Sequence, residues 1–183
     1  MTDYTPEAAA CATARKRSSI SGPPNTLEPA TSQFAPAATD GVFWFVVDHV
    51  ATRWTEDPQA WHDLTPEQRT VLVLGVWRLE VRTGGFERYF RYDGADTAME
   101  ALEAARLLPP GYRSVLADAV RVFGLPYPTD VWAREEILDE VLARDPFRLD
   151  EVDEALRTLE REEPCDGLLD AWIWSHRGAF FDG

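Results

Sequence analysis

Carboxylates are the side chains of this chain best placed to do chemistry, because they crowd its last third. Residues 135–170 contain fourteen Asp and Glu in thirty-six residues, against four arginines. On a continuous helix this density is about one carboxylate per 4 Å of axis, whereas a DNA strand carries one phosphate per roughly 3.4 Å. Carboxylates three or four residues apart have Cβ atoms about 5–6 Å apart, close to the step between neighbouring phosphates. An acidic helical ridge could therefore occupy the basic groove of a DNA-binding protein.

Eight of these carboxylates are predicted to bind a basic partner as phosphate surrogates, and we call them the acidic face. They are Glu135, Glu136, Asp139, Glu140, Asp150, Glu151, Asp153 and Glu154. The spacing places most of them on the polar sides of amphipathic helices. The alternative interpretation is a solvated surface that only aids solubility.

The net charge and its distribution support a basic partner. The formal charge is −14 for the whole chain, of which residues 130–183 carry −10, with six basic and sixteen acidic groups. Such a field repels nucleic acid and anionic membranes and attracts basic proteins. We therefore expect no direct contact with nucleic acid or with a membrane.

Catalytic and metal-binding patterns are not found in the sequence. The three histidines, His49, His62 and His176, are scattered, and the two cysteines, Cys11 and Cys165, have no metal-ligand spacing. Neither a phosphate-binding glycine loop nor a GxSxG nucleophile elbow occurs. The sequence therefore predicts a non-enzymatic protein without metal or cofactor.

An enzyme stays open as a third hypothesis. A hydrolase-type enzyme would need a pocket near Glu80, Trp77, Tyr89 and His49. A deep polar pocket there would favour it, and a convex acidic ridge would favour a binding protein.

Composition changes sharply near residue 40. Residues 1–40 are rich in Ala, Thr, Ser and Pro with few large apolar groups, which predicts a disordered tail. The chain has no apolar run of 18 residues, and its N-terminus lacks the apolar stretch of a signal peptide. We expect a cytoplasmic protein in which residues 41–183 form a single helical domain.

From Gly41 onward the pattern predicts helix after helix. Residues 42–54 carry an apolar stripe at helical spacing, although their β-branched content leaves a buried strand over 42–47 as an alternative. Thr65, Pro66 and Gln68 form a capping box with proline in the first turn, which predicts a helix from Pro66 to about Arg82.

Later segments repeat the helical pattern with short connections. Helices are predicted over 97–108, 111–124, 131–144, 149–162 and 166–181. Short connections suit antiparallel packing of neighbouring helices. The fold class is all-α, with about seven to nine helices.

A pair of glycines separates the helix that begins at Pro66 from three aromatic residues, in the stretch LEVRTGGFERYF at 79–90. Two glycines would each cost a helix interior about 1 kcal/mol, so they predict a corner that ends one helix and turns the aromatics into the core. We call Glu80, Gly84, Gly85, Phe86, Tyr89 and Phe90 the glycine–aromatic motif.

The glycine–aromatic motif resembles the core of the DNA-mimic protein family, and the similarity spans roughly residues 62–125. The resemblance implies an all-α fold. For at least one branch it also implies an acidic dimer that sequesters a helix-turn-helix transcription regulator by presenting carboxylates in place of phosphates. A homodimer is therefore among the assemblies to expect.

The leading hypothesis is an acidic protein that binds a basic DNA-binding protein and competes with DNA. The alternative is an inhibitor or immunity-type protein for a basic enzyme such as a nuclease or toxin, because acidic inhibitors use the same electrostatic steering. Identification of the partner would separate the two.

Overall fold

The computed structural model describes residues 41–57 and 59–181. Within these residues the chain forms nine α-helices and three short 3₁₀ helices, with no strand. The α-helices are α1 (Val42–Glu56), α2 (Ala60–Asp63), α3 (Pro66–Phe90), α4 (Ala98–Ala104), α5 (Pro110–Val120), α6 (Val131–Arg144), α7 (Asp150–Glu162), α8 (Asp166–Ser175) and α9 (Gly178–Phe181). The 3₁₀ helices are η1 (Asp93–Thr97), η2 (Ala105–Leu107) and η3 (Arg121–Phe123). The predicted all-α fold is confirmed, and the predicted tail, residues 1–40, lies outside the described residues.

The first helix uses the apolar stripe that its spacing predicts. Phe43, Val46, Val47 and Val50 are all buried in the core, and the alternative of a strand over 42–47 is wrong. A helical period of 3.6 residues gathers these side chains on one side, whereas a strand would divide them between two faces.

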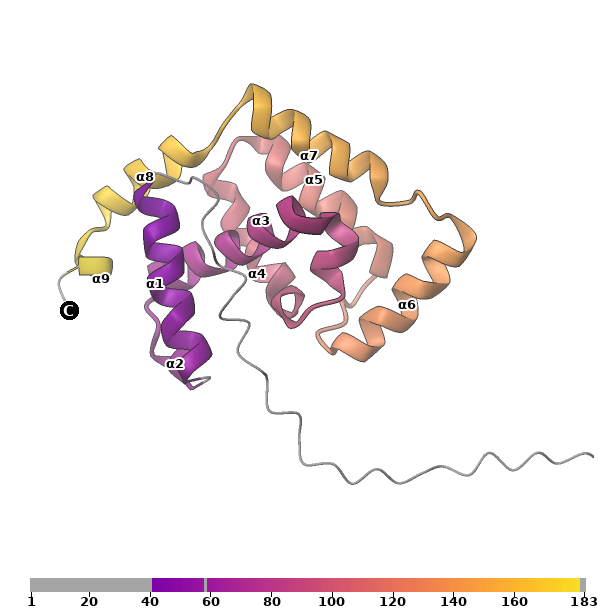
Figure 1. Cartoon of the computed structure of the whole chain (residues 1–183), viewed down its shortest axis with the longest axis horizontal. Coiled ribbons are helices and arrows are strands. Elements are labelled where there is room, and N and C mark those ends of the chain that lie inside the picture. Colours follow the sequence, from indigo (N-terminus) through magenta and orange to yellow (C-terminus); the bar gives the residue numbers. More distant parts are fainter. Residues whose placement is uncertain (1–40, 58, 182–183) are drawn as a thin grey trace, which may run out of the picture.

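Helix α3 runs through the middle of the molecule and contacts α1, α4, α6, α7 and α9 (Figure 1). It begins at the predicted capping box: Thr65 Oγ1 accepts from the Gln68 backbone N–H at 3.2 Å, and Gln68 Oε1 accepts from the Thr65 N–H at 3.1 Å. Every residue over 71–78 is buried, and Leu79 is half-buried. This all-round burial marks α3 as the core helix.

A sharp kink divides α3 at the predicted corner. Gly84 has φ −157° and ψ 19°, and Gly85 has φ 78° and ψ −179°. The positive φ of Gly85 favours glycine, and a Cβ added at Gly84 would lie 2.5 Å from Arg88 Cδ and 2.9 Å from Arg88 Cβ. Beyond the kink, Phe86, Tyr89 and Phe90 are completely buried, so the prediction that the glycines turn the aromatics into the core is confirmed.

Small residues bring α4 close to α3. Ala98, Ala101 and Ala105 are completely buried on the packed side of this segment, as their small size allows. The next helical segment, α5 with η3, stops at Gly124, whose φ of 72° again suits glycine.

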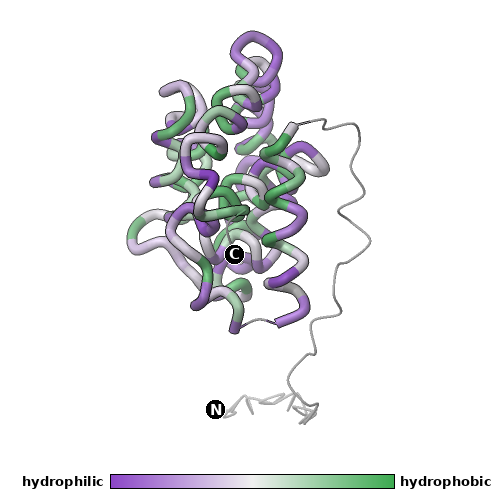
Figure 2. The backbone as a smooth tube through the Cα atoms, turned by 90° about the vertical axis from the view of Figure 1, so that its left-hand side faces the viewer, coloured by the Kyte–Doolittle hydropathy of each residue, from purple (hydrophilic) through white to green (hydrophobic). Residues whose placement is uncertain are grey.

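Helices α6, α7 and α8 form an outer arc around the other helices (Figure 1). α6 packs against α3 and η3, α7 against α5 and α3, and α8 against α1. Hydrophobic and hydrophilic stretches alternate along the helices (Figure 2), as expected where each helix turns one side to a core. No helix in the described part of the chain is both long and apolar enough to span a bilayer.

Candidate partner-binding surface

One buried side of α6 determines which of its residues face solvent. Asp130 caps the helix, with its Oδ1 accepting from the Ala133 N–H at 3.0 Å. Arg134 and Leu138, one turn apart, have no exposed surface. The carboxylates of α6 lie on the other sides of the helix and are half-buried or exposed.

Arg134 fixes the position of α6 through a buried hydrogen-bond network. Its guanidinium donates to the carbonyls of Phe90 (3.1 Å), Tyr92 (3.0 Å) and Thr129 (2.9 Å), and pairs with Asp96 Oδ1 at 2.6 Å. An arginine has five N–H donors in a rigid fork and needs this many acceptors when it is buried. The network joins α6 to the end of α3 and to η1.

A second buried arginine joins α3 to α7 and α8. Arg78 is 2 % exposed and pairs with Glu160 of α7 at 3.1 Å and with Asp166 of α8 at 2.6 Å. Its guanidinium also lies over the ring of Trp44, 5.4 Å from the centroid. Two carboxylates of the acidic last third therefore serve the core rather than a partner.

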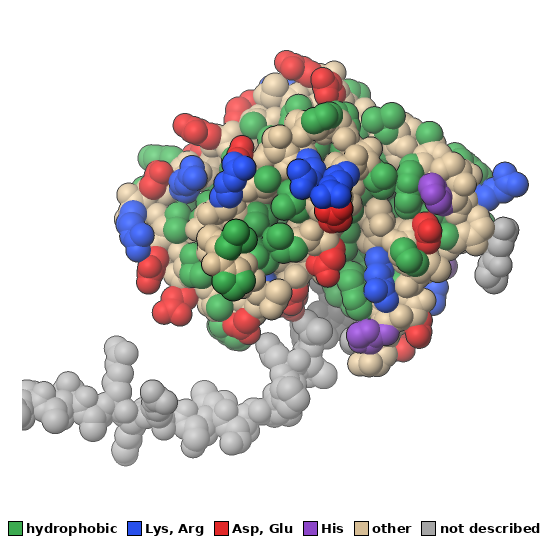
Figure 3. All heavy atoms as spheres, turned by 180° about the vertical axis from the view of Figure 1, so that it is seen from behind, with side chains coloured by type: hydrophobic (Ala, Val, Ile, Leu, Met, Phe, Trp, Pro, Cys, Tyr) green, Lys and Arg blue, Asp and Glu red, His purple; other side chains and the backbone are tan. Residues whose placement is uncertain are grey.

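Most of the acidic face is exposed. Its exposed members are Glu136, Asp139, Glu140, Asp150, Glu151 and Glu154, and its half-buried members are Glu135 and Asp153. Figure 3, in which α6 lies at the left and α7 at the top, shows acidic side chains along that rim with basic side chains between them. The structure thus brings the residues of α6 and α7 to one rim of the molecule.

Arginines neutralise part of this charge. Asp139 pairs with Arg91 (2.8 Å), Glu140 with Arg144 (2.9 Å), and Glu154 with Arg157 (3.2 Å) and Arg161 (3.4 Å). Among the described residues, Glu135, Glu136, Asp150 and Glu151 make no ion pair. Of these four, the exposed Glu136, Asp150 and Glu151 are the most available to a basic partner.

Asp153 has a structural contact that the sequence did not reveal. Its Oδ1 accepts from the Phe86 N–H at 2.8 Å, so α7 caps the part of α3 that restarts after the kink. A Cβ added at Gly85 would lie 2.4 Å from Asp153 Oδ2. The signal was present in the spacing, since position 153 is four residues after Leu149 and three before Leu156, both buried.

An ion pair also joins the two parts of α3 on either side of the kink. Glu80, before the kink, accepts from Arg88 Nε, after it, at 2.7 Å, and both residues are half-buried. The glycine–aromatic motif is therefore a structural unit that positions α7, and so half of the acidic face.

We expect Asp153→Asn to keep the stability of the protein and Asp153→Ala to lower it by about 1–2 kcal/mol. The asparagine Oδ1 still accepts from the Phe86 N–H, whereas alanine leaves that donor without its cap. Urea unfolding of both variants measures the difference. Equal stability of the two would show that the cap contributes nothing.

The pH dependence of the same variants provides an independent check. Burial raises the pKa of Asp153, although the Phe86 N–H and Arg157 act in the opposite direction. The folded state then binds this proton more tightly than the unfolded state, so stability falls as pH rises from the ordinary Asp pKa of about 4 through the raised value. This loss should be absent from Asp153→Asn.

The four residues named for an enzyme pocket do not share one opening. Trp77 and Tyr89 are completely buried, His49 is exposed on α1, and Glu80 is paired with Arg88. The hypothesis of a pocket at these residues gains no support. In the described part of the chain no group of three or more His, Cys, Asp and Glu side chains is placed to hold a metal ion.

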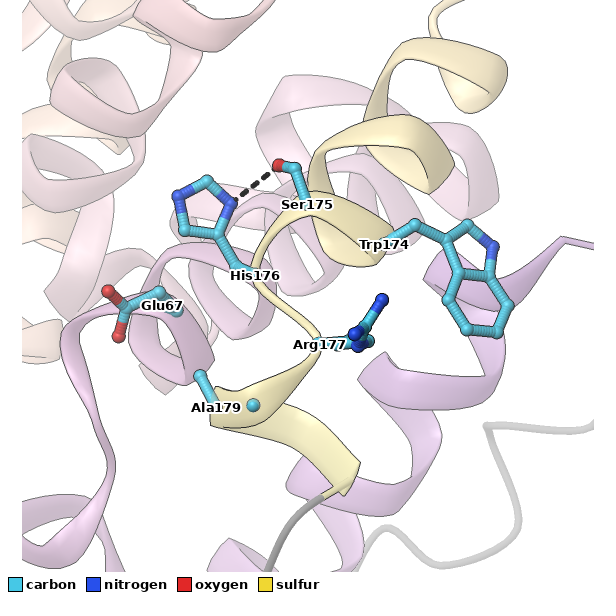
Figure 4. Close-up of a pocket in the computed structure, with 7 residues that line it drawn as sticks. Glu67, Trp174, Ser175, His176, Arg177 and Ala179 are labelled. Atoms are coloured by element: carbon cyan, nitrogen blue, oxygen red, sulfur yellow. Dashed lines mark hydrogen bonds between the residues drawn. The ribbon is translucent and has the colours of Figure 1, made fainter.

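A surface hollow near α9 brings together Ser175, His176 and Glu67 (Figure 4). Ser175 Oγ lies 2.9 Å from His176 Nδ1, but each of these atoms also lies within 2.8 Å of the Trp172 carbonyl. When Nδ1 carries a proton toward that carbonyl, it cannot take the proton of Ser175. The contacts therefore describe a helix C-terminus and not an activated nucleophile.

Comparison with known proteins identifies the family. A family model described as DMP19-like protein matches residues 62–176, which is more than half of the chain. The match extends past residues 62–125, the segment that resembles the DNA-mimic protein family, and takes in α6, α7 and α8. No curated protein and no solved structure matches the chain. The chain therefore belongs to the DMP19-like protein family.

Proposed function

We propose that this chain binds a basic DNA-binding protein of the helix-turn-helix class and competes with DNA for it. The acidic face presents carboxylates where DNA would present phosphates, and catalysis plays no part. The observation that carries the proposal is the exposure of the acidic face along α6 and α7, in a chain of the DMP19-like family.

The spacing of the exposed carboxylates supports this function. Glu136 and Glu140 are one turn apart on α6, and Asp150 and Glu154 are one turn apart on α7. Such pairs hold their Cβ atoms about 5–6 Å apart, so a row of arginines or lysines that contacts successive phosphates could contact them as well.

The arginines on this surface leave the carboxylates accessible. Glu140 and Arg144, for example, are both more than 60 % exposed, and exposed pairs of this kind contribute only about 0–1 kcal/mol. A basic partner that offers several cations at once can replace them. Electrostatic steering then favours rapid association at low salt.

Displacement of operator DNA tests the proposal directly. Purified helix-turn-helix regulators from the same source, each bound to a fluorescent operator, are titrated with the chain while anisotropy is recorded. We expect release of DNA from at least one regulator at about 50 mM salt and loss of binding toward about 500 mM, because salt screens exposed charges. Failure to release DNA from any regulator, or inhibition of a nuclease or toxin instead, would overturn the proposal.

A charge-reversal pair locates the surface. We expect Glu136→Lys with Glu151→Lys to weaken binding of the regulator by about 10- to 100-fold at low salt, because two attractive contacts become repulsive. The measurement is the affinity for the displaced regulator and its salt dependence.

A matched variant separates local from overall charge. Asp48→Lys with Glu56→Lys makes the same change in net charge on exposed positions of α1, on the side of the molecule opposite α6 (Figure 1). It should change the affinity for the regulator by less than about threefold, because salt screens charges that do not contact the partner directly. An equal loss of affinity from both variants would show that the regulator does not bind specifically at the acidic face.

A further inference from the structure

Large apolar side chains flank the acidic residues of α6. Trp132, in its first turn, is 73 % exposed, and Phe147, three residues after its end, is 71 % exposed. Trp174, the other strongly exposed tryptophan, packs its ring 5.7 Å from that of Phe181. Trp132 has no ring or cation–π partner among the described residues.

Trp132 shares a side of α6 with the carboxylates. Positions 132, 136, 139 and 143 follow one another by three or four residues, so they form one stripe about 16 Å long. The buried Arg134 and its fixed acceptors prevent the helix from rotating this stripe inward. Exposed hydrophobic and acidic side chains lie side by side over this part of the surface (Figure 3).

This combination fits the chemistry of a DNA-reading helix better than that of a simple polycation. Such a helix carries arginines and lysines for phosphates and base edges, and apolar side chains that contact thymine methyl groups. An exposed tryptophan can take up the apolar groups and can also lie beneath an arginine. In protein interfaces, tryptophans surrounded by polar side chains contribute a large share of the binding energy.

We propose that Trp132 and Phe147 are apolar anchors of the partner interface, contacting the recognition helix of the regulator while neighbouring carboxylates contact its cations. This inference rests on the proposed function and deepens it, because it explains how the chain would select a DNA-binding protein among other basic proteins. The two anchors, at opposite ends of α6, fit within one interface of ordinary size, which buries about 800 Å² on each partner.

The test measures affinity at several salt concentrations with two probes. One probe is the helix-turn-helix regulator found by operator displacement, and the other is a 20-residue polylysine peptide, which has charge but no apolar recognition surface. The variants are Trp132→Ala and Phe147→Ala. The controls are Phe45→Ala on α1, where the side chain is 65 % exposed, and Trp174→Ala on α8.

We expect Trp132→Ala to weaken binding of the regulator by about 10- to 30-fold at every salt concentration, an effect typical of an interface hot spot. Phe147→Ala should act in the same direction. The salt slope should stay unchanged, because an apolar contact releases no counterions, and binding of polylysine should change less than about twofold. The charge-reversal pair should instead flatten the salt slope with both probes.

The outcomes distinguish this inference from the proposed function. If Trp132→Ala behaves like Phe45→Ala while the charge-reversal pair still weakens the regulator, the anchors are wrong and the proposed function stands. If Trp132→Ala weakens binding of polylysine as much as binding of the regulator, the anchors do not help the chain to select the regulator over other basic partners. If neither the aromatic nor the charge variants change binding, both proposals fail.

Discussion

Replacing Arg134 by methionine should destabilise the folded protein by about 3–5 kcal/mol. The side chain has no exposed surface and donates to four backbone carbonyls, those of Phe90, Tyr92, Pro128 and Thr129, and to Asp96. Methionine fills much of the volume but leaves those acceptors without donors inside the protein, the situation in which loss of one buried partner is most costly. Urea unfolding followed by circular dichroism measures the effect.

Two further variants keep this prediction testable if Arg134→Met does not fold. Arg134→Lys retains the charge but cannot reach every acceptor, so we expect a smaller loss of about 2 kcal/mol. Arg106→Met removes an exposed arginine whose one ion pair within the described residues is with Glu103, and this change should cost less than about 0.5 kcal/mol. Similar stability for the buried and the exposed variants would contradict the assigned role of the network.

The second large effect is expected at the corner of α3, where Gly85→Ala should lower stability by about 2–4 kcal/mol. The φ of 78° is strained for any residue with a Cβ, which costs about 1–3 kcal/mol. The new methyl group would also lie 2.4 Å from Asp153 Oδ2, so it would displace the carboxylate that caps Phe86. Thermal and urea unfolding of the variant measure the sum of the two effects.

Two other glycines separate strain from collision. Gly124 has a similar φ of 72° but an added Cβ would meet nothing within 4 Å, so Gly124→Ala should show the strain alone. Gly167 in α8 has neither a positive φ nor a near neighbour, and Gly167→Ala should be neutral or stabilise by up to about 1 kcal/mol through helix propensity. If Gly85→Ala were as stable as Gly167→Ala, the kink in α3 would not explain why the glycine–aromatic motif contains Gly85.

The corner also connects stability with the proposed binding surface. Displacing Asp153 would loosen α7 from α3, although Arg78 would still hold it through Glu160. Gly85→Ala should therefore weaken binding of the regulator indirectly, in proportion to the loss in the free energy of unfolding. Glu136→Lys with Glu151→Lys should instead weaken this binding without any loss of stability.

Local signals in the sequence determined the secondary structure. The capping box at Thr65, the cap at Asp130 and the positive φ of Gly85 and Gly124 depend on residues no more than four positions apart. Such interactions follow from chain geometry alone. For the same reason the helical period identified the buried stripe of α1 and the outward acidic side of α6.

The tertiary structure alone decided which charged groups belong to the core and which face solvent. Asp153, a member of the predicted acidic face, caps a helix 67 residues away, and Arg134, one of the few cations in the acidic third, is buried among acceptors up to 44 residues away. The cost of burying a charged group depends on the neighbours that packing places around it. Composition carries no information about these neighbours, so it cannot distinguish a buried charge from an exposed one. The sequence thus determined the helices and the acidic excess. Packing left Glu136, Asp150 and Glu151 exposed and without an ion pair to any described residue, and it left Trp132 exposed one turn before Glu136.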